Sequence, residues 1–228
     1  TRCRCVPTPL FCWSYGMDET PIASTGATVG FELSLGLIGV AVAFAAGFWQ
    51  PAELLTLGMP YQADSVQDVT SALLWGTLGT LPMLGIIGLL YQIPLKSLQN
   101  LSTLMDQQLI PMFEGKSLTA LAATAAAAGI GEEILFRWTI QTGFAEGLQL
   151  PYATFWGVII ASIVFGLMHW LTPAYAVIAG GISVYLGIQL LITESFWGVI
   201  LTHSLYDFVI LIYLVKFRAP RLNRTETS

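Results

Sequence analysis

Six apolar stretches, each about 20 residues long, follow one another along the chain and are separated by shorter polar segments. A helix of about 20 residues crosses a hydrocarbon layer about 30 Å thick, so each stretch is expected to span a membrane. The expected spans are residues 27–49, 71–93, 117–142, 151–171, 173–192 and 195–215. The pattern therefore predicts an all-α, polytopic membrane bundle with about six transmembrane helices.

Residues 94–114 have a different pattern. Leu98, Leu101, Met105 and Leu109 recur at spacings of three and four, with polar residues between them. This periodicity is typical of an amphipathic helix, which would lie along the membrane surface or over the end of the bundle. A soluble connecting helix is an equally good interpretation.

The composition supports a membrane protein. Of the 228 residues, 55% are hydrophobic and only 10% are charged, against about 25% charged in an ordinary soluble domain. Nine basic residues are too few for a phosphate-binding stripe, so nucleic acid is not an expected partner. Cys3, Cys5 and Cys12 are odd in number, lack CxxC spacing and lie in the first dozen residues, which argues against a disulfide framework or a structural zinc site.

The basic residues indicate an orientation in the membrane. With the N-terminus inside, one side carries Arg2, Arg4, Lys96, Lys116, Lys216, Arg218, Arg221 and Arg224. The other side carries only acidic residues, namely Glu53, Asp64, Asp68, Glu146 and Glu194. The positive-inside rule then places both termini on the cytoplasmic side or its organellar equivalent. The first residues are similar in composition to a transit peptide, and a chloroplast thylakoid membrane is one compatible location.

The charges inside the span at 117–142 point to chemistry. A charge near the bilayer centre costs several kcal/mol unless it is paired or faces a water-filled cavity. Glu133 and Arg137 are four residues apart on one helix face and are expected to form an ion pair. Glu132 points about 100° away around the helix axis, so its carboxylate is left for another purpose.

Both histidines of the chain also lie in apolar helices. His169 ends the fourth span, and His203 stands four residues before Asp207 in the sixth. Asp207 can therefore accept a hydrogen bond from one ring nitrogen of His203 and fix the tautomer of the ring. A single histidine in a core is usually structural, but two histidines together with the carboxylate pair favour a functional site.

A glutamate and two histidines in a water-filled pocket predict hydrolysis. The glutamate can take a proton from water while one histidine holds that water, and the other can stabilise an oxyanion. Ser204 adjoins His203 but points away from it, and the cysteines are remote, so neither competes as a nucleophile. A zinc-dependent alternative would use His169, His203 and a carboxylate from position 132, 133 or 207, with Glu132 as the first choice. The chain has no H-E-x-x-H motif to support it, and the preferred interpretation requires no cofactor.

Three motifs in register resemble a known family. They are Glu132-Glu133-x-x-x-Arg137, Phe165-x-x-x-His169 and His203-x-x-x-Asp207, and they are similar to those of the CPBP intramembrane proteases. This group includes the type II CAAX prenyl endopeptidases and the bacteriocin self-immunity (ABI) proteins, and the resemblance covers roughly residues 94–217. It implies an all-helical membrane core with a catalytic cavity. By this resemblance Glu132 would act as the base together with His169. His203 and the residue at position 207 would hold the oxyanion. Glu133 and Arg137 would be the supporting pair.

One position departs from the pattern of the prenyl-processing members. They have asparagine where this chain has Asp207, and an ionised aspartate cannot donate a hydrogen bond to an oxyanion. Cleavage at a CAAX sequence is therefore a weaker expectation than peptide hydrolysis as such.

Together these observations predict four segments. They are a poorly ordered N-terminal tail (1–26), two transmembrane helices (27–93), a CPBP-like catalytic core of the amphipathic helix and four spans (94–216), and a basic C-terminal tail (217–228). The expected function is that of an intramembrane endopeptidase acting on a protein or peptide with a membrane-associated segment. The alternative is a non-proteolytic scaffold or immunity protein that retains the fold. The oligomeric state is left open.

The predicted spans raise a geometric problem. If all helices were upright, His169 would lie near the inner end of the fourth span and His203 in the outer third of the sixth. The two rings can meet only if helices are strongly tilted or if the connection at 143–151 dips into the membrane.

Overall fold

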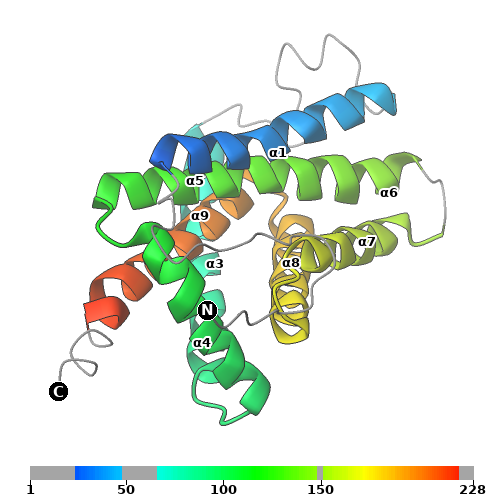
Figure 1. Ribbon diagram of the computed structural model, residues 1–228. Helices are drawn as coiled ribbons and strands as arrows, with labels where there is room; N and C mark the ends of the chain where they lie inside the picture. The colour runs from blue at the N-terminus through cyan, green and yellow to red at the C-terminus, as the bar shows by residue number, and fades with distance from the viewer. Residues whose placement is uncertain (1–23, 48–65, 148–150, 221–228) are drawn as a thin grey trace.

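The structure is a computed structural model and describes residues 24–47, 66–147 and 151–220. Within these ranges every regular element is helical, which confirms the predicted all-α membrane bundle (Figure 1). The helices are α1 (Thr25–Ala45), α3 (Val66–Leu90), α4 (Lys96–Phe113), α5 (Leu118–Glu133), η1 (Ile134–Thr142), α6 (Gly143–Gly147), α7 (Ala153–Met168), α8 (Pro173–Thr193), α9 (Phe196–Ile212) and η2 (Tyr213–Arg218).

Five helical stretches in the described residues are long and apolar enough to cross a membrane. The fourth predicted span, residues 151–171, is shorter than expected because α7 has 16 residues, about 24 Å at 1.5 Å per residue. Tyr152 adopts a left-handed conformation (φ 62°) before the helix, and His169 leaves helical geometry after it. Residues at both ends of the apolar stretch therefore belong to turns rather than to the helix.

The third predicted span is one continuous rod made of α5, η1 and α6. Its middle part, η1, is a π-helix, which the hydrophobic pattern did not predict. The hydroxyls of Thr139 and Thr142 donate to the carbonyls five residues earlier, those of Ile134 and Arg137. Each hydroxyl thus gives a backbone carbonyl of the wider π-helical turn a hydrogen-bond donor. The wide turns begin directly after Glu133, and such turns are frequent at functional sites.

The amphipathic helix α4 packs over one end of the bundle. Its apolar residues Ile110 and Phe113 are buried and contact the ends of α5, α9 and η2. On its other side, Arg218 of η2 forms an ion pair with Asp106 and also hydrogen-bonds Ser102. The sequence pattern allowed a helix on the membrane surface, a helix over the end of the bundle or a soluble connecting helix. The structure shows the second of these arrangements.

Glycines set the close crossings of the bundle. A Cβ at Gly131 of α5 would lie 1.9 Å from the carbonyl oxygen of Glu32, so only glycine lets α1 approach there. A Cβ at Gly129, half a turn earlier, would meet the side chain of Ser204 on α9. Figure 1 shows α1 lying along α5 in consequence. Helices in lipid associate through such close packing, because there is no water to drive them together.

Helix α8 carries a stripe of small residues, Ala176, Gly180, Ser183 and Gly187, that packs against α7. A Cβ at Gly166 of α7 would lie 2.6 Å from the carbonyl of Ala176, and a Cβ at Gly187 would lie 3.1 Å from Val158. One member of the stripe, Ser183, has a polar function instead, because its hydroxyl accepts hydrogen bonds from Arg137.

Hydrogen bonds between helices fix α9 against α3 and α8. Gln189 donates to the hydroxyl of Thr202 at 2.8 Å, and that hydroxyl donates to the carbonyl of Gly76 at 3.1 Å. The hydroxyl of Tyr185 donates to the carbonyl of Gly79 at 2.8 Å. Thr202 precedes His203, so this network holds the part of α9 that carries the histidine.

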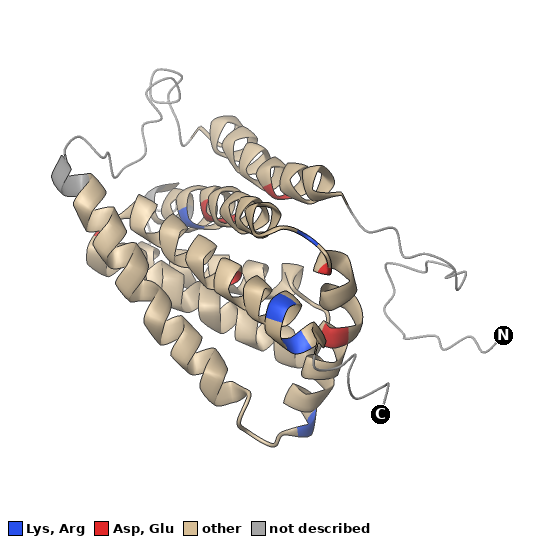
Figure 2. Ribbon diagram, turned by 90° about the vertical axis from the view of Figure 1, so that its left-hand side faces the viewer, with Lys and Arg blue, Asp and Glu red and all other residues tan. Residues whose placement is uncertain are grey.

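Figure 2 shows how few charged residues the ribbon carries. Lys216 donates to the backbone carbonyl of Lys116, so the start of α5 and the end of η2 form one basic end of the bundle. Which side of the membrane this end faces stays a prediction. The N-terminal tail before residue 24, the C-terminal tail after 220, and the loop acids Glu53 and Asp64 lie outside the described residues.

Candidate active site

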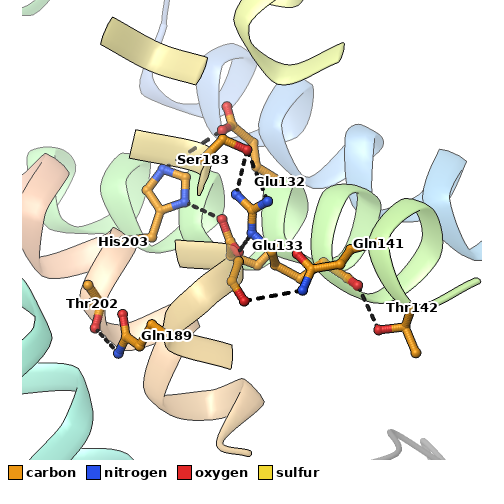
Figure 3. A network of polar contacts seen from close by, with 10 residues as sticks. Glu132, Glu133, Gln141, Thr142, Ser183, Gln189, Thr202 and His203 are labelled. Atoms are coloured by element: carbon orange, nitrogen blue, oxygen red, sulfur yellow. Dashed lines mark hydrogen bonds and ion pairs between the residues drawn. The ribbon is translucent and has the colours of Figure 1, made fainter. Parts of the chain in front are cut away.

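The two adjacent glutamates at the end of α5 are buried but face different surroundings. Glu133 is fully buried and Glu132 is 7% exposed. Successive residues of a helix point about 100° apart, and Figure 3 shows Glu133 directed at Arg137 and His203. Glu132 instead lines a cavity. The separation of roles expected from the helical geometry is therefore present in the structure.

Glu133 is the centre of a fully buried polar network. Its Oε2 accepts a hydrogen bond from Nε of Arg137 at 2.8 Å, and neither side chain is exposed. The two terminal nitrogens of Arg137 each lie 3.0 Å from the hydroxyl oxygen of Ser183. The ion pair predicted from the four-residue spacing is thus formed, and α8 contributes a further partner that the spacing could not reveal.

The second oxygen of Glu133 determines the orientation of His203. Its Oε1 accepts a hydrogen bond from Nδ1 of His203 at 2.8 Å, because a carboxylate can only accept when ionised. The other ring nitrogen, Nε2, lies 3.4 Å from Asp207 and 3.8 Å from Glu132. The partner at Nδ1 is therefore Glu133, and the expected contact between His203 and Asp207 is formed at the other ring nitrogen, Nε2. Asp207 lies on the opposite side of the ring, where Nε2 faces the cavity.

His169, at the end of α7, directs its Nε2 toward the carboxylate of Glu132. The ring stacks on Phe165 at a centroid distance of 4.3 Å, and Nδ1 lies 2.9 Å from the carbonyl oxygen of Phe165. A carbonyl can only accept, so Nδ1 carries the proton, and in the neutral ring Nε2 has a free lone pair. That Nε2 lies 3.9 Å from Oε1 of Glu132.

The geometric problem posed by upright helices is resolved by the way α7 returns along the rod. About as many residues separate Glu132 from the end of α6 as separate the start of α7 from His169. Because α7 packs antiparallel to η1, with a Cβ at Gly157 only 2.3 Å from the carbonyl of Gln141, His169 comes back to the level of Glu132. The crossing of α9 at Gly129 brings His203 to the same level.

The four candidate residues line one cavity of about 600 Å³, which also extends beneath α4. Glu132, His169, His203 and Asp207 are among its lining residues. Helix α4 contributes apolar side chains, among them Leu101, Met105 and Leu109, and also the polar residues Gln99, Ser102 and Thr103. A cavity of this size accommodates several water molecules or a few residues of a peptide.

The described residues contain no group of three histidine, cysteine, aspartate or glutamate side chains that could hold a metal. Zinc ligands would surround the ion at about 2.0–2.2 Å. Nε2 of His169 and Nε2 of His203 both lie within 4 Å of the Glu132 carboxylate, at 3.9 and 3.8 Å. The zinc-dependent version therefore stays an alternative to be tested.

Sequence reasoning missed a further carboxylate at the site. Glu32 of α1 lines the same cavity, and its backbone packs against Gly131, next to Glu132. The available signal was a charged residue within an otherwise apolar span, but its position near one end of the predicted span allowed a place in the headgroup region. Only the crossing of α1 and α5 shows that it reaches the site.

Comparison with known proteins agrees with this geometry. Residues 114–209 match the family model of the type II CAAX prenyl endopeptidase Rce1-like group. This segment is therefore similar to an Rce1-like domain. The match confirms the resemblance seen in the motifs and extends from just before α5 to within α9. Neither the curated proteins nor the solved structures gave a match.

The match relates residues 114–209 to a family of CAAX-type intramembrane proteases. Together with the five apolar helices, it identifies an integral membrane protein. Helices α1, α3 and α4 lie outside the matched segment, although α1 and α4 both contribute to the cavity.

The buried ion pair leads to a prediction about stability. Arg137→Met leaves Glu133 charged and short of its main partner, which should cost about 3–5 kcal/mol of unfolding free energy. Adding Glu133→Gln to that variant removes the uncompensated charge and should restore part of the loss. Unfolding of the purified protein in detergent measures both effects.

Lys96→Met is the matched control, because it makes a similar exchange at an exposed position at the start of α4. It should change the unfolding free energy by less than about 0.5 kcal/mol. An Arg137→Met protein as stable as the control would contradict the structural importance of the pair.

Proposed function

We propose that the protein is an intramembrane endopeptidase in which Glu132 activates a water molecule for attack on a peptide bond. The observation that supports this most directly is the convergence of Glu132 with Nε2 of His169 and Nε2 of His203 at one end of a cavity. Three separate helices supply these groups. An ionisable side chain inside an apolar membrane bundle is costly, so such residues are usually functional.

The hydrogen bonds suggest how the work is divided. His169 donates from Nδ1 to Phe165, so its Nε2 can accept a hydrogen bond from the water and hold it. Glu132 then takes a proton from that water as its oxygen attacks the carbonyl carbon of the substrate. When the C–N bond breaks, the proton on Glu132 passes to the leaving amine, which returns the carboxylate to its starting state.

His203 is suited to stabilise the oxyanion. With Nδ1 donating to Glu133, Nε2 can donate to an oxyanion only when the ring is positively charged. Glu133 and Asp207 lie on opposite sides of the ring, at 2.8 and 3.4 Å, and both stabilise that charge. Asp207 therefore acts through His203, and this removes the need for a donor at position 207.

The substrate class follows from the cavity and the membrane. The cavity is lined both by ionisable groups and by many apolar side chains, and an extended peptide with an apolar, membrane-associated segment has matching chemistry. The proposal is limited to hydrolysis of such a peptide. Both termini on the cytoplasmic or equivalent side, and a thylakoid location, stay predictions.

The assignment of Glu132 as the base predicts that Glu132→Gln lowers the rate of cleavage by about 10²–10⁴-fold or more, because the amide cannot accept the proton of water. Its size and position are preserved, so folding and amount should be unchanged. The measurement uses the full chain in proteoliposomes with a mixture of single-span peptides and identifies new termini by mass spectrometry.

Glu194→Gln is the control, since Glu194 is exposed and does not line the cavity. It should cleave at the rate of the unchanged protein. If the unchanged protein produces no new termini, or if Glu132→Gln retains the full rate, the alternative of a non-proteolytic scaffold or immunity protein is favoured.

A second prediction separates the glutamate mechanism from the zinc-dependent one. Incubation of the active protein with a strong chelator should leave the rate unchanged, because no step uses a metal. The rate is followed across a chelator titration, with each divalent metal then added back separately. Loss of activity that one specific metal restores would overturn the assignment of Glu132 as an unassisted base.

A further inference from the structure

Glu32 of α1 is a half-buried glutamate that the proposed reaction does not use. Its Oε2 is buried and has no hydrogen-bond partner among the described residues, and its side chain lines the cavity that contains Glu132. A buried charge without a partner is costly. The close crossing at Gly131 nevertheless holds the backbone of Glu32 directly against α5, so the carboxylate is kept at the site by the packing of the helices.

The described wall of the cavity contains several carboxyl groups and no basic side chain other than the two histidines. Three carboxylates line it, those of Glu32, Glu132 and Asp207, and no lysine or arginine is among the described residues of its wall. The guanidinium of Arg137 is fully buried between Glu133 and Ser183 and does not reach the cavity. Even if both imidazoles were charged, they would not balance three carboxylates.

A second observation concerns the hydrogen bonding of the two glutamates. Glu132 is more than nine-tenths buried, and its Oε2 also has no hydrogen-bond partner among the described side chains. Two glutamates on different helices, α1 and α5, thus line one cavity, and each has a carboxylate oxygen without a hydrogen bond. In a cavity of low dielectric constant the group that they stabilise most is a cation that donates hydrogen bonds.

We propose that Glu32 is a substrate-binding residue that accepts hydrogen bonds from a positively charged group, such as a lysine side chain, close to the bond that is cleaved. The inference rests on the proposed protease function and adds the class of substrate to it. It also means that the cavity disfavours a carboxylate near that bond, including a free C-terminal one. The family match does not cover Glu32, because it begins at residue 114.

The test measures binding separately from hydrolysis. The full chain carrying Glu132→Gln, which cannot consume the probe, is placed in nanodiscs of phosphatidylcholine. The probes are three fluorescent leucine–alanine peptides, blocked at both ends, which differ only in a central lysine, norleucine or glutamate. Fluorescence anisotropy gives a Kd for each peptide.

The lysine peptide should bind about fivefold or more tightly than the norleucine peptide, as expected for one partly desolvated charge pair, and the glutamate peptide should bind most weakly. Adding Glu32→Gln should make the lysine and norleucine peptides bind about equally, whereas adding Glu194→Gln should leave the preference intact. Equal binding of these two peptides before that change, or a preference that survives it, would overturn the proposal.

The two proposals fail in different ways. If the lysine preference depends on Glu32 but the unchanged protein hydrolyses none of the peptides, the protease function is wrong and the cation site stands. If the unchanged protein hydrolyses all three peptides and binds them equally, the protease function stands and the role of Glu32 is wrong.

Discussion

The cost of placing charge in an apolar bundle is the constraint on which this structure depends. Glu133 meets it by dividing its two oxygens between Arg137 and His203, at 2.8 Å in each case. One buried carboxylate therefore neutralises a guanidinium and orients an imidazole. Because Glu133 is saturated in this way, its neighbour Glu132 has no strong partner and faces the cavity instead. The proposed division between a structural glutamate and a reactive one rests on this arrangement.

The position of the site depends on backbone contacts that only glycine permits. Gly129 and Gly131 lie within one turn of the glutamates, and each allows a different helix to touch α5. The first brings His203 and the second brings Glu32 to the level of Glu132. The π-helical turns that follow Glu133 keep Arg137 on the side of α8, where Ser183 accepts from it. Packing and chemistry are therefore specified by the same few residues of α5.

The residues of the candidate site could be selected from the sequence because charge and histidine are rare in its apolar spans. The four-residue spacing was sufficient to pair Glu133 with Arg137. The succession of six apolar stretches was sufficient to predict the fold class. Neither could show that Glu133 also binds His203, since that contact joins residues 70 positions apart. The length of α7 could not be predicted either, because apolar residues in the turns at its ends continue the hydrophobic pattern.

Glu32 shows a different limit of sequence reasoning. A charge near the end of a predicted span is compatible with the headgroup region, and only a tertiary crossing places it at the site. Ser183 was hidden for a related reason, because a serine among small residues indicates close packing as readily as hydrogen bonding. In both cases the decisive information lies in which helices touch, and the local pattern does not contain it.

The most direct test of the account is a crystal structure of the full chain at a resolution that shows ordered water. The account predicts a water molecule within hydrogen-bonding distance of both the Glu132 carboxylate and Nε2 of His169, with Nδ1 of His203 on Glu133. A metal ion bound between the two imidazoles, or a Glu132 carboxylate directed away from both rings, would contradict it.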